Sequence, residues 1–334
     1  METLRLDLHC HTRYSDGSDT VAQLVEKARA AGLGFVAPTD HDVVNDAAVA
    51  ALRAAGIASC EAVEVSVRDA ETGHSFHVLC YARKISDRIR ALLAPVAEGR
   101  GSWEAKIAAL AKRGLTGDYA GLLAWKKEHG CLGATGSRHV RAYLWQRPGN
   151  PERVRELVRL ENERRVAAGQ PPFAPEILAV RDSAAMHRLL WKEGGPLAAP
   201  DLFPKEPKVD LGELAAAARE CGALLSVAHP NFSFMKKGGP QGWADRLDRY
   251  AQLGIEGVEL NPFAGPEWVA EIRRQSEARG LVVTFGSDSH GPRDATHGAL
   301  GEIHPEAARD EAWYAAHVRK FLDRAWAAER KGAA

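Results

Sequence analysis

Short stretches in which apolar and polar residues alternate are each followed by a stretch with helical spacing, and this order repeats near both ends of the chain. In residues 4–9 leucine recurs at every second position, which predicts a strand. Residues 20–31 predict a helix with Asp19 as its N-cap. Further strands are expected at residues 35–39, 58–67, 75–81, 223–228, 257–260 and 281–285, and further helices at residues 46–55, 211–220, 243–253 and 267–279. Such alternation implies a parallel sheet, open or closed.

The middle of the chain, from residue 83 to about residue 209, has almost no strand signal. Its helices are expected at residues 102–113, 119–128, 138–145, 152–168 and 175–191. A Pro-rich return loop, residues 194–207, closes this helical insertion. Residues 310–331 predict one more helix, amphipathic, whose apolar stripe is Tyr314, Val318, Phe321, Leu322 and Trp326.

Composition narrows the class of protein. The 334 residues, 45% of them hydrophobic, suit one large barrel-type domain or two ordinary ones. Lys and Arg equal Asp and Glu at 44 each, so we expect no stable nucleic-acid complex and no anionic membrane partner. The five cysteines are scattered without a C-x-x-C pair, which argues against disulfides and a thiolate zinc site. With no signal sequence and no apolar run of transmembrane length, a cytoplasmic protein is expected.

Two histidines, His9 and His11, follow the first predicted strand at a spacing of two residues. Side chains at i and i+2 of a strand point to the same side, so both imidazoles can bind one ion. Taken alone, the pair fits a solvent-facing strand equally well. Asp288 and His290 repeat the spacing after the last predicted strand.

Other metal-binding residue types also fall on or after separate strands. The complete set of expected ligands is His9, His11, Asp16, His41, Glu64, His77, His229, Asp288 and His290. Active sites form at the carboxyl ends of strands in barrels and open α/β sheets, so these side chains are expected to meet. Nine ligands exceed the coordination of one ion and suit two or three divalent ions. Nitrogen and oxygen donors favour Mn, Fe or Zn.

Some neighbouring residues are expected to act differently. Asp40 and Asp42 are interpreted as carboxylates that orient ring N–H groups, which gives Asp40 a place in catalysis. The histidines outside the motifs are interpreted as ordinary surface or packing residues; they are His187, His297, His304 and His317.

The chain resembles the polymerase and histidinol phosphatase (PHP) family. The motifs that carry the resemblance are His9-Cys10-His11 with Ser15-Asp16-Gly17, Thr39-Asp40-His41-Asp42, Glu64 with Ser66, His77, Ala228-His229-Pro230, and Ser287-Asp288-Ser289-His290-Gly291. The resemblance covers about residues 4–82 and 210–304. It implies a distorted (β/α)7 barrel with a helical insertion after the fourth strand and a trinuclear metal site.

The resemblance also implies how ligands and domains are distributed. One ion would lie among His9, His11, Glu64 and Asp288; a second among Glu64, His77 and His229; and a third among Asp16, His41 and His290. The barrel domain would comprise residues 1–82 and 210–304, and residues 83–209 would form a helical cap. Residues 305–334 would form a C-terminal helix packed on the barrel.

A subgroup of the family with such an insertion resembles nucleotide phosphoesterases and carries an Arg-Pro-His-Ile-Ala run. Here the run is Ser137-Arg138-His139-Val140-Arg141, which keeps the histidine but replaces Arg-Pro by Ser-Arg. We therefore expect substrate binding by Ser137, Arg138, His139 and Lys237, with Lys236 as a neighbouring candidate. His139 is also a candidate general acid.

These features predict a metal-dependent phosphoesterase that uses a metal-bridging hydroxide on a small phosphorylated metabolite, foremost a nucleotide phosphate monoester. One alternative is a phosphatase for histidinol phosphate or another sugar or metabolite phosphate. Another is an amidohydrolase, although no lysine stands at a mid-barrel strand end for a carbamylated-lysine site. A third is a metal-binding module without enzymatic activity.

Overall fold

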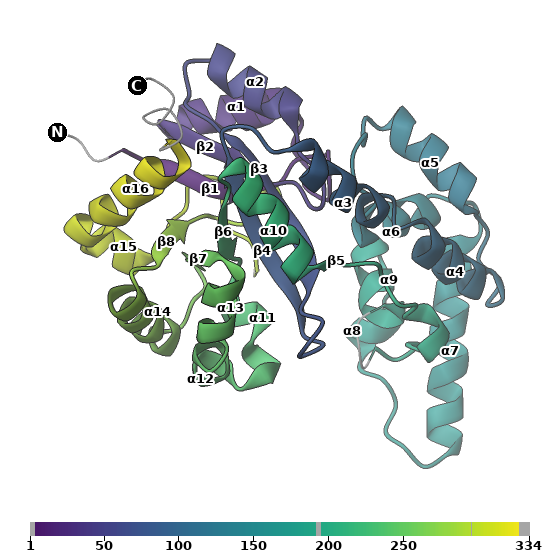
Figure 1. Ribbon diagram of the computed structural model, residues 1–334. Coiled ribbons are helices and arrows are strands. Elements are labelled where there is room, and N and C mark those ends of the chain that lie inside the picture. The colour runs from purple at the N-terminus through teal and green to yellow at the C-terminus, as the bar shows by residue number, and fades with distance from the viewer. Residues whose placement is uncertain (1–3, 192–194, 295, 327–334) are drawn as a thin grey trace. The chain divides into compact units, whose positions relative to one another are not determined.

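The computed structural model describes residues 4–191, 195–294 and 296–326 (Figure 1). The chain folds into two compact units, residues 1–97 with 208–334 and residues 98–207. The expected boundaries at residues 82/83 and 209/210 lie close to this division. Helix α3 (Asp87–Glu98) accounts for much of the offset, because its Ile89 and Leu93 are buried in the core of the first unit.

The strands belong to the first unit. They are β1 (Leu6–Cys10), β2 (Phe35–Pro38), β3 (Glu61–Arg68), β4 (Ser75–Ala82), β5 (Val209–Asp210), β6 (Leu224–Val227), β7 (Ile255–Leu260) and β8 (Val282–Phe285). Strands β1 and β2 form a parallel pair, and the others form a sheet in the order β5-β3-β4-β6-β7-β8. Apolar side chains fill these strands, in which most residues are buried.

The expected parallel arrangement of the sheet is interrupted at one strand. Strand β4 runs antiparallel to both of its neighbours, β3 and β6. The link between β3 and β4 is a tight turn, which can join only antiparallel strands. The turn is closed by hydrogen bonds from the Asp69 amide to the His74 carbonyl and from the Gly73 amide to the Asp69 carbonyl.

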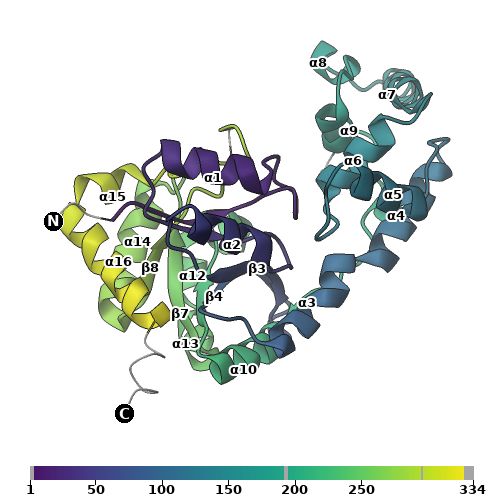
Figure 2. The same ribbon diagram turned by 90° about the horizontal axis from the view of Figure 1, so that it is seen from above.

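Isolated bridges connect the two sheets. Cys10 pairs with Ser289 beyond the end of β8, and His41 pairs with Glu64 of β3. The short β1-β2 pair therefore lies between β8 and β3. Seen from above, helices α1, α10 and α16 lie on the outside of the strands (Figure 2).

The helices of the first unit cover the strands with their apolar faces. Beside α3 they are α1 (Val21–Ala30), α2 (Asp46–Ala54), α10 (Leu211–Cys221), α11 (Pro230–Ser233), α12 (Gly239–Ala244), α13 (Leu247–Leu253), α14 (Pro266–Arg279), α15 (Pro305–Arg309) and α16 (Glu311–Trp326), with the 3₁₀ turn η2 (Met235–Lys237). Thr20, not Asp19, caps α1: its side chain accepts from the Gln23 amide, whereas Asp19 pairs with Lys27 at 2.6 Å.

The C-terminal helix α16 packs on the first unit through its predicted stripe. Tyr314, Val318 and Phe321 are buried in the main core, and Leu322 packs against it. Residues 327–331 of the expected helix and the Trp326 side chain lie outside the described residues.

The second unit is helical. Its elements are α4 (Arg100–Ala111), α5 (Tyr119–Glu128), α6 (Ser137–Trp145), α7 (Asn150–Ala167), α8 (Pro175–Leu178), α9 (Ser183–Leu190) and the 3₁₀ turn η1 (Pro200–Leu202). The segment expected as one helix at residues 175–191 is divided between α8 and α9. A separate core forms around Trp103, Leu122 and Tyr143. In the described part of the chain, no helix combines the length and hydropathy needed to cross a membrane.

Candidate metal centre

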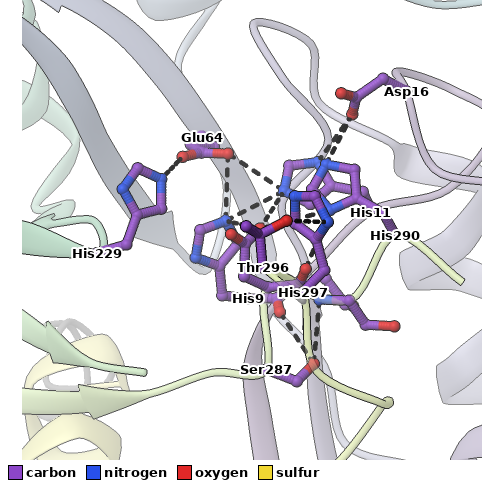
Figure 3. A network of polar contacts seen from close by, with 12 residues as sticks. His9, His11, Asp16, Glu64, His229, Ser287, His290, Thr296 and His297 are labelled. Carbon is purple, nitrogen blue, oxygen red and sulfur yellow. Dashed lines mark hydrogen bonds and ion pairs between the residues drawn. The ribbon is translucent and has the colours of Figure 1, made fainter. Parts of the chain in front are cut away.

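Glu64 of β3 is the centre of a cluster of imidazoles in the first unit. Its Oε2 atom lies 3.1 Å from a ring nitrogen of each of His9, His11 and His41. Its Oε1 atom lies 2.9 Å from Nδ1 of His77 and 2.8 Å from Nε2 of His229. Figure 3 shows Glu64 between His229, which one of its oxygens reaches, and the rings of His9 and His11, which lie near the other oxygen. One fully buried carboxylate therefore faces five histidines.

His9 and His11 approach each other as the strand spacing predicts. Their Nε2 atoms are 3.1 Å apart. Asp288, which follows β8, places Oδ1 3.4 Å from Nε2 of His9 and 3.3 Å from Nε2 of His11. His9, His11, Glu64 and Asp288 can thus direct one ligand atom each at a common point.

A second group lies at the opening of the cluster. Oδ1 of Asp16 is 3.0 Å from Nε2 of His290, 3.9 Å from Nε2 of His41 and 3.7 Å from Nδ1 of His11. Asp16, His41 and His290 come from three separate loops, and with His11 they form another set of four that can hold an ion.

His77 reaches the cluster because β4 is reversed. It is the third residue of β4, opposite Ser66 of β3. In an antiparallel strand the amino-terminal end lies beside the carboxyl ends of its neighbours. The carbonyl of His77 accepts from the amide of Ala228, and its Nδ1 lies 3.4 Å from Nε2 of His229.

The structure adds one residue that the sequence analysis missed. Glu259 of β7 is buried, with Oε1 2.8 Å from Nδ1 of His9 and Oε2 accepting from the amide of His229 at 2.7 Å. An acidic residue within an apolar strand was the available signal, but Glu256 of the same strand gives the same signal and is exposed. Asp40 was expected to orient a histidine ring, and in the structure Glu259 does so for His9.

Asp40 instead holds the loop that follows β1. Its Oδ1 accepts from the amide of Thr12 at 2.8 Å and the hydroxyl of Ser15 at 2.7 Å. Its Oδ2 accepts from the hydroxyl of Thr12 and the side-chain amide of Asn45, both at 2.8 Å. Asp42 likewise accepts from the amide of Ser66 at 2.7 Å. These carboxylates fix the backbone that carries His11, Asp16 and His41.

His297 lies at the cluster, contrary to its interpretation as an ordinary residue. Its ring is 4.1 Å from that of His290, centroid to centroid, and it can share an ion with Asp288 and His290. Its Nδ1 donates to Asp294, whose oxygens lie at 3.0 and 3.1 Å. Thr296 lies beside it (Figure 3). Because residues 287–291 were recognised only as a strand-end motif, the return of the following loop to the site was not foreseen.

Backbone strain is concentrated here. Among the described residues other than glycine, Asp42, His229 and Asp288 have positive φ, at 54°, 27° and 52°. Such conformations cost free energy and persist where surrounding contacts enforce them. Two of the three are expected metal ligands, and the third adjoins His41.

The electrostatics differ between the rings of the cluster and favour positive charge at His9 but not at His41. Although burial acts against a charged ring, Glu259, Glu64 and Asp288 raise the pKa of His9 well above its usual range. Although burial opposes it, the surrounding rings hold the pKa of Glu64 well below its usual range. Burial lowers the pKa of His41 to about 3, so this ring is neutral, as a metal ligand must be.

The residues fit divalent ions. Oε2 of Glu64 is buried without a hydrogen-bond donor of acceptable geometry, although three ring nitrogens lie 3.1 Å away. A buried carboxylate oxygen without a hydrogen-bond donor lowers the stability of the fold. A cation between the oxygen and the ring nitrogens would satisfy all of them at once. All nine expected ligands lie in this cluster.

A comparison with protein families matches residues 7–160 to the PHP domain. The matched segment contains His9, His11, His41, Glu64 and His77 of the cluster. This part of the chain therefore matches a PHP domain. Other cluster residues, His229, Asp288 and His290, lie beyond the matched segment.

Curated relatives of this chain are named as phosphoesterases. It is 27% identical over 296 residues to the phosphoribosyl 1,2-cyclic phosphate 1,2-diphosphodiesterase of Eggerthella lenta, covering 85% of this chain and 94% of the relative. It is 33% identical over 124 residues to the 3',5'-nucleoside bisphosphate phosphatase of Chromobacterium violaceum, covering 36% of this chain and 43% of the relative.

A solved structure shares the fold of the chain. A Bifidobacterium adolescentis protein, described as a metal-dependent phosphoesterase, aligns with a TM-score of 0.65 at 23% identity and covers 96% of both chains. The architecture is thus a mixed α/β fold shared with this structure.

The expected substrate-binding residues are divided between the units. Ser137, Arg138 and His139 form the first turn of α6 in the second unit, where His139 is buried and its Nδ1 accepts from the amide of Gly136 at 3.1 Å. Lys237 is exposed in η2 of the first unit, eight residues after His229. Their roles remain predictions.

Proposed function

We propose that this phosphoric ester hydrolase acts on a small phosphorylated metabolite, foremost a nucleotide, at a cluster of two or three divalent ions. The observation that supports it best is Glu64, whose two oxygens lie within 3.1 Å of five histidine rings. A carboxylate so surrounded is suited to bridging ions. The bridges of Cys10 to Ser289 and of His41 to Glu64 also support closure of the strands into the seven-unit barrel.

The nine expected ligands would hold the ions, and their nitrogen and oxygen donors favour Mn, Fe or Zn. Bound divalent ions lower the pKa of coordinated water towards neutrality and neutralise charge that develops on phosphoryl oxygens. In the overall reaction, water adds across the P–O ester bond, the phosphorus keeps the new oxygen, and the leaving oxygen takes a proton.

The chain itself supplies orientation and further contacts. Glu259 fixes the His9 ring, and Asp40 fixes the loop that carries Asp16. His297, held through Nδ1 by Asp294, is available to a phosphoryl oxygen at the cavity wall. Arg138 and Lys237 would add positive charge to the phosphate, and His139 would protonate the leaving oxygen or donate to the phosphate.

A cyclic phosphodiester is a second candidate substrate. The alignment with the E. lenta diphosphodiesterase spans 94% of that relative, whereas the alignment with the nucleoside bisphosphate phosphatase spans 43% of the other. The replacement of Arg-Pro by Ser-Arg before His139 also separates this chain from the nucleotide-phosphatase motif.

The test is a ³¹P NMR assay of the Mn²⁺-loaded protein on a substrate panel. The panel holds nucleoside monophosphates and 3',5'-bisphosphates, ribose 5-phosphate, histidinol phosphate and a phosphoribosyl 1,2-cyclic phosphate. We expect hydrolysis of at least one ester by the wild-type protein and none by His9→Ala. A protein that retains its metal and hydrolyses no phosphoester would refute the proposal. Preference for the cyclic ester would select the second candidate.

A further inference from the structure

Part of the wall of the cavity over the cluster is formed by side chains that are not expected metal ligands. The cavity has a volume of about 230 Å³, and ten side chains line it. Seven of these are expected ligands. The other three are Phe232, Thr296 and His297, and of these Phe232 alone is apolar. A molecule that binds with its phosphate at the ligands can place another part against these three side chains.

The position of Phe232 is built into the local backbone. It lies in the short helix α11, directly after the strained His229, and its amide donates to the His229 carbonyl at 2.9 Å. Its ring centroid is 6.0 Å from that of His229. The residue that holds a metal and the residue that lines the wall are therefore fixed relative to each other by one turn.

Phe232 lies next to Phe263, and Phe263 lies next to the guanidinium of Arg293. Its centroid lies 6.5 Å from that of Phe263, and the guanidinium of Arg293 lies 5.4 Å from the Phe263 centroid. Phe263 is held by a hydrogen bond from its amide to Asn261 at 3.0 Å, and Arg293 by Glu302 at 3.0 Å. Phe232 and Phe263 both remain partly exposed, unlike the phenylalanines of the main core.

We infer that Phe232, backed by Phe263, is a specificity-determining residue that receives a planar ring of the substrate, such as a nucleobase. An aromatic face half open to a cavity of imidazoles and carboxylates offers little to a sugar phosphate. A base that stacks on such a face gains about 1–3 kcal/mol. The inference rests on the proposed function, which places the phosphate at the metal cluster. The base would then be the part of the substrate by which the protein distinguishes one phosphate ester from another.

Adenosine 5'-monophosphate and ribose 5-phosphate make the test specific, because they share phosphate and sugar and differ in the base. Binding of each to the Mn²⁺-loaded protein is measured by calorimetry, and KM and kcat are measured where turnover occurs. In Phe232→Leu we expect the Kd and KM for the adenine nucleotide to rise about tenfold. Both constants for ribose 5-phosphate should stay within about twofold. Phe232→Tyr should restore nucleotide binding, because it keeps the aromatic face.

Phe203→Leu, at an exposed phenylalanine of the second unit, is the matched control and should leave both ligands unaffected. Equal losses for the two ligands in Phe232→Leu would overturn the inference, since they would assign the ring to packing. Wild-type protein that binds the nucleotide no more tightly than ribose 5-phosphate would overturn it too. If no phosphoester is hydrolysed, the proposed function fails, and the difference in binding between the two ligands still decides the role of Phe232.

Discussion

The Oε1 atom of Glu259 lies 2.8 Å from Nδ1 of His9, and both side chains are buried. A carboxylate in this position fixes the tautomer of the ring and directs Nε2 towards the ligand cluster. The second oxygen of Glu259 holds the amide of His229, so one side chain sets the position of two expected ligands.

Glu259→Gln is expected to weaken metal binding by about 10–100-fold, the usual effect of removing a carboxylate that supports a ligating histidine. Chelator competition with Mn²⁺ measures the change. Glu256→Gln is the matched control, because Glu256 lies on the same strand but pairs with Arg324 on the surface. Equal metal affinity in Glu259→Gln and wild type would contradict the assigned role.

Removing metal should lower thermal stability. The folded cluster gathers Glu64, Asp16 and Asp288, whereas an unfolded chain offers no formed site, so a bound ion stabilises the fold. At a free metal concentration of 100 times Kd the gain is about 2.7 kcal/mol per ion. Chelation should lower the Tm of the wild-type protein and leave that of His9→Ala much less affected. Calorimetric scans with and without Mn²⁺ test this, and a metal-independent wild-type Tm would count against the site.

Gly286 marks a point where two strands approach too closely for a side chain. A Cβ there would lie 2.3 Å from Cβ of His9 and 2.7 Å from Oε1 of Glu259. Gly286→Ala should therefore destabilise the protein by about 1–3 kcal/mol and reduce metal affinity. Urea unfolding and metal titration measure the two effects.

Gly101→Ala is the control for this substitution. Gly101 lies inside helix α4, and a Cβ there meets no atom within 4 Å. Gly101 is the second residue of α4, where alanine is tolerated at least as well as glycine, so this variant should keep its stability or gain up to about 0.5 kcal/mol. Loss of stability in both variants would show that steric contact is not the cause.

His317 predicts a stability loss in mild acid. Burial lowers its pKa to about 4, and its Nδ1 accepts from the amide of Val283 at 3.0 Å, which requires the neutral ring. The unfolded chain, with a pKa near 6.5, takes up the proton first. The contribution of His317 is thus complete above about pH 6.5 and is lost as the pH falls towards 4.

The metal-free protein isolates this effect from ligand protonation. Between pH 7 and pH 5, wild type should lose on the order of 1–2 kcal/mol more unfolding free energy than His317→Gln, which keeps an acceptor but no titrating group. Urea unfolding at the two pH values gives the difference. Parallel pH profiles for the two proteins would exclude a neutral buried His317.

The sequence was sufficient to predict that the nine expected ligands gather in one place, because they lie on or shortly after strands, where spacing determines direction. His9 and His11 show this most clearly. The reversal of β4 was also open to prediction, because only seven residues separate the expected strands at residues 58–67 and 75–81, too few for the crossover that parallel strands need. The reversal mattered little for the prediction of His77, because its residue type had already identified it.

Glu259 and His297 were missed for different reasons. In β7, Glu256 and Glu259 are indistinguishable by type, and only the packing of the folded chain makes one buried and the other exposed. His297 lies on an irregular loop whose path depends on contacts such as that between the Gly298 amide and the Ser287 carbonyl. Local patterns carry no information on either point.

The bridge between Cys10 and Ser289 has a consequence for synthesis in the cell. The ribosome releases His9 and His11 early, but Asp288 and His290, which are expected to help hold the same group of ions, emerge almost 280 residues later. A nascent chain therefore carries an incomplete set of ligands for most of translation. Full metal loading has to wait for the carboxyl-terminal strand, so metal capture would report that the chain has been completed and folded.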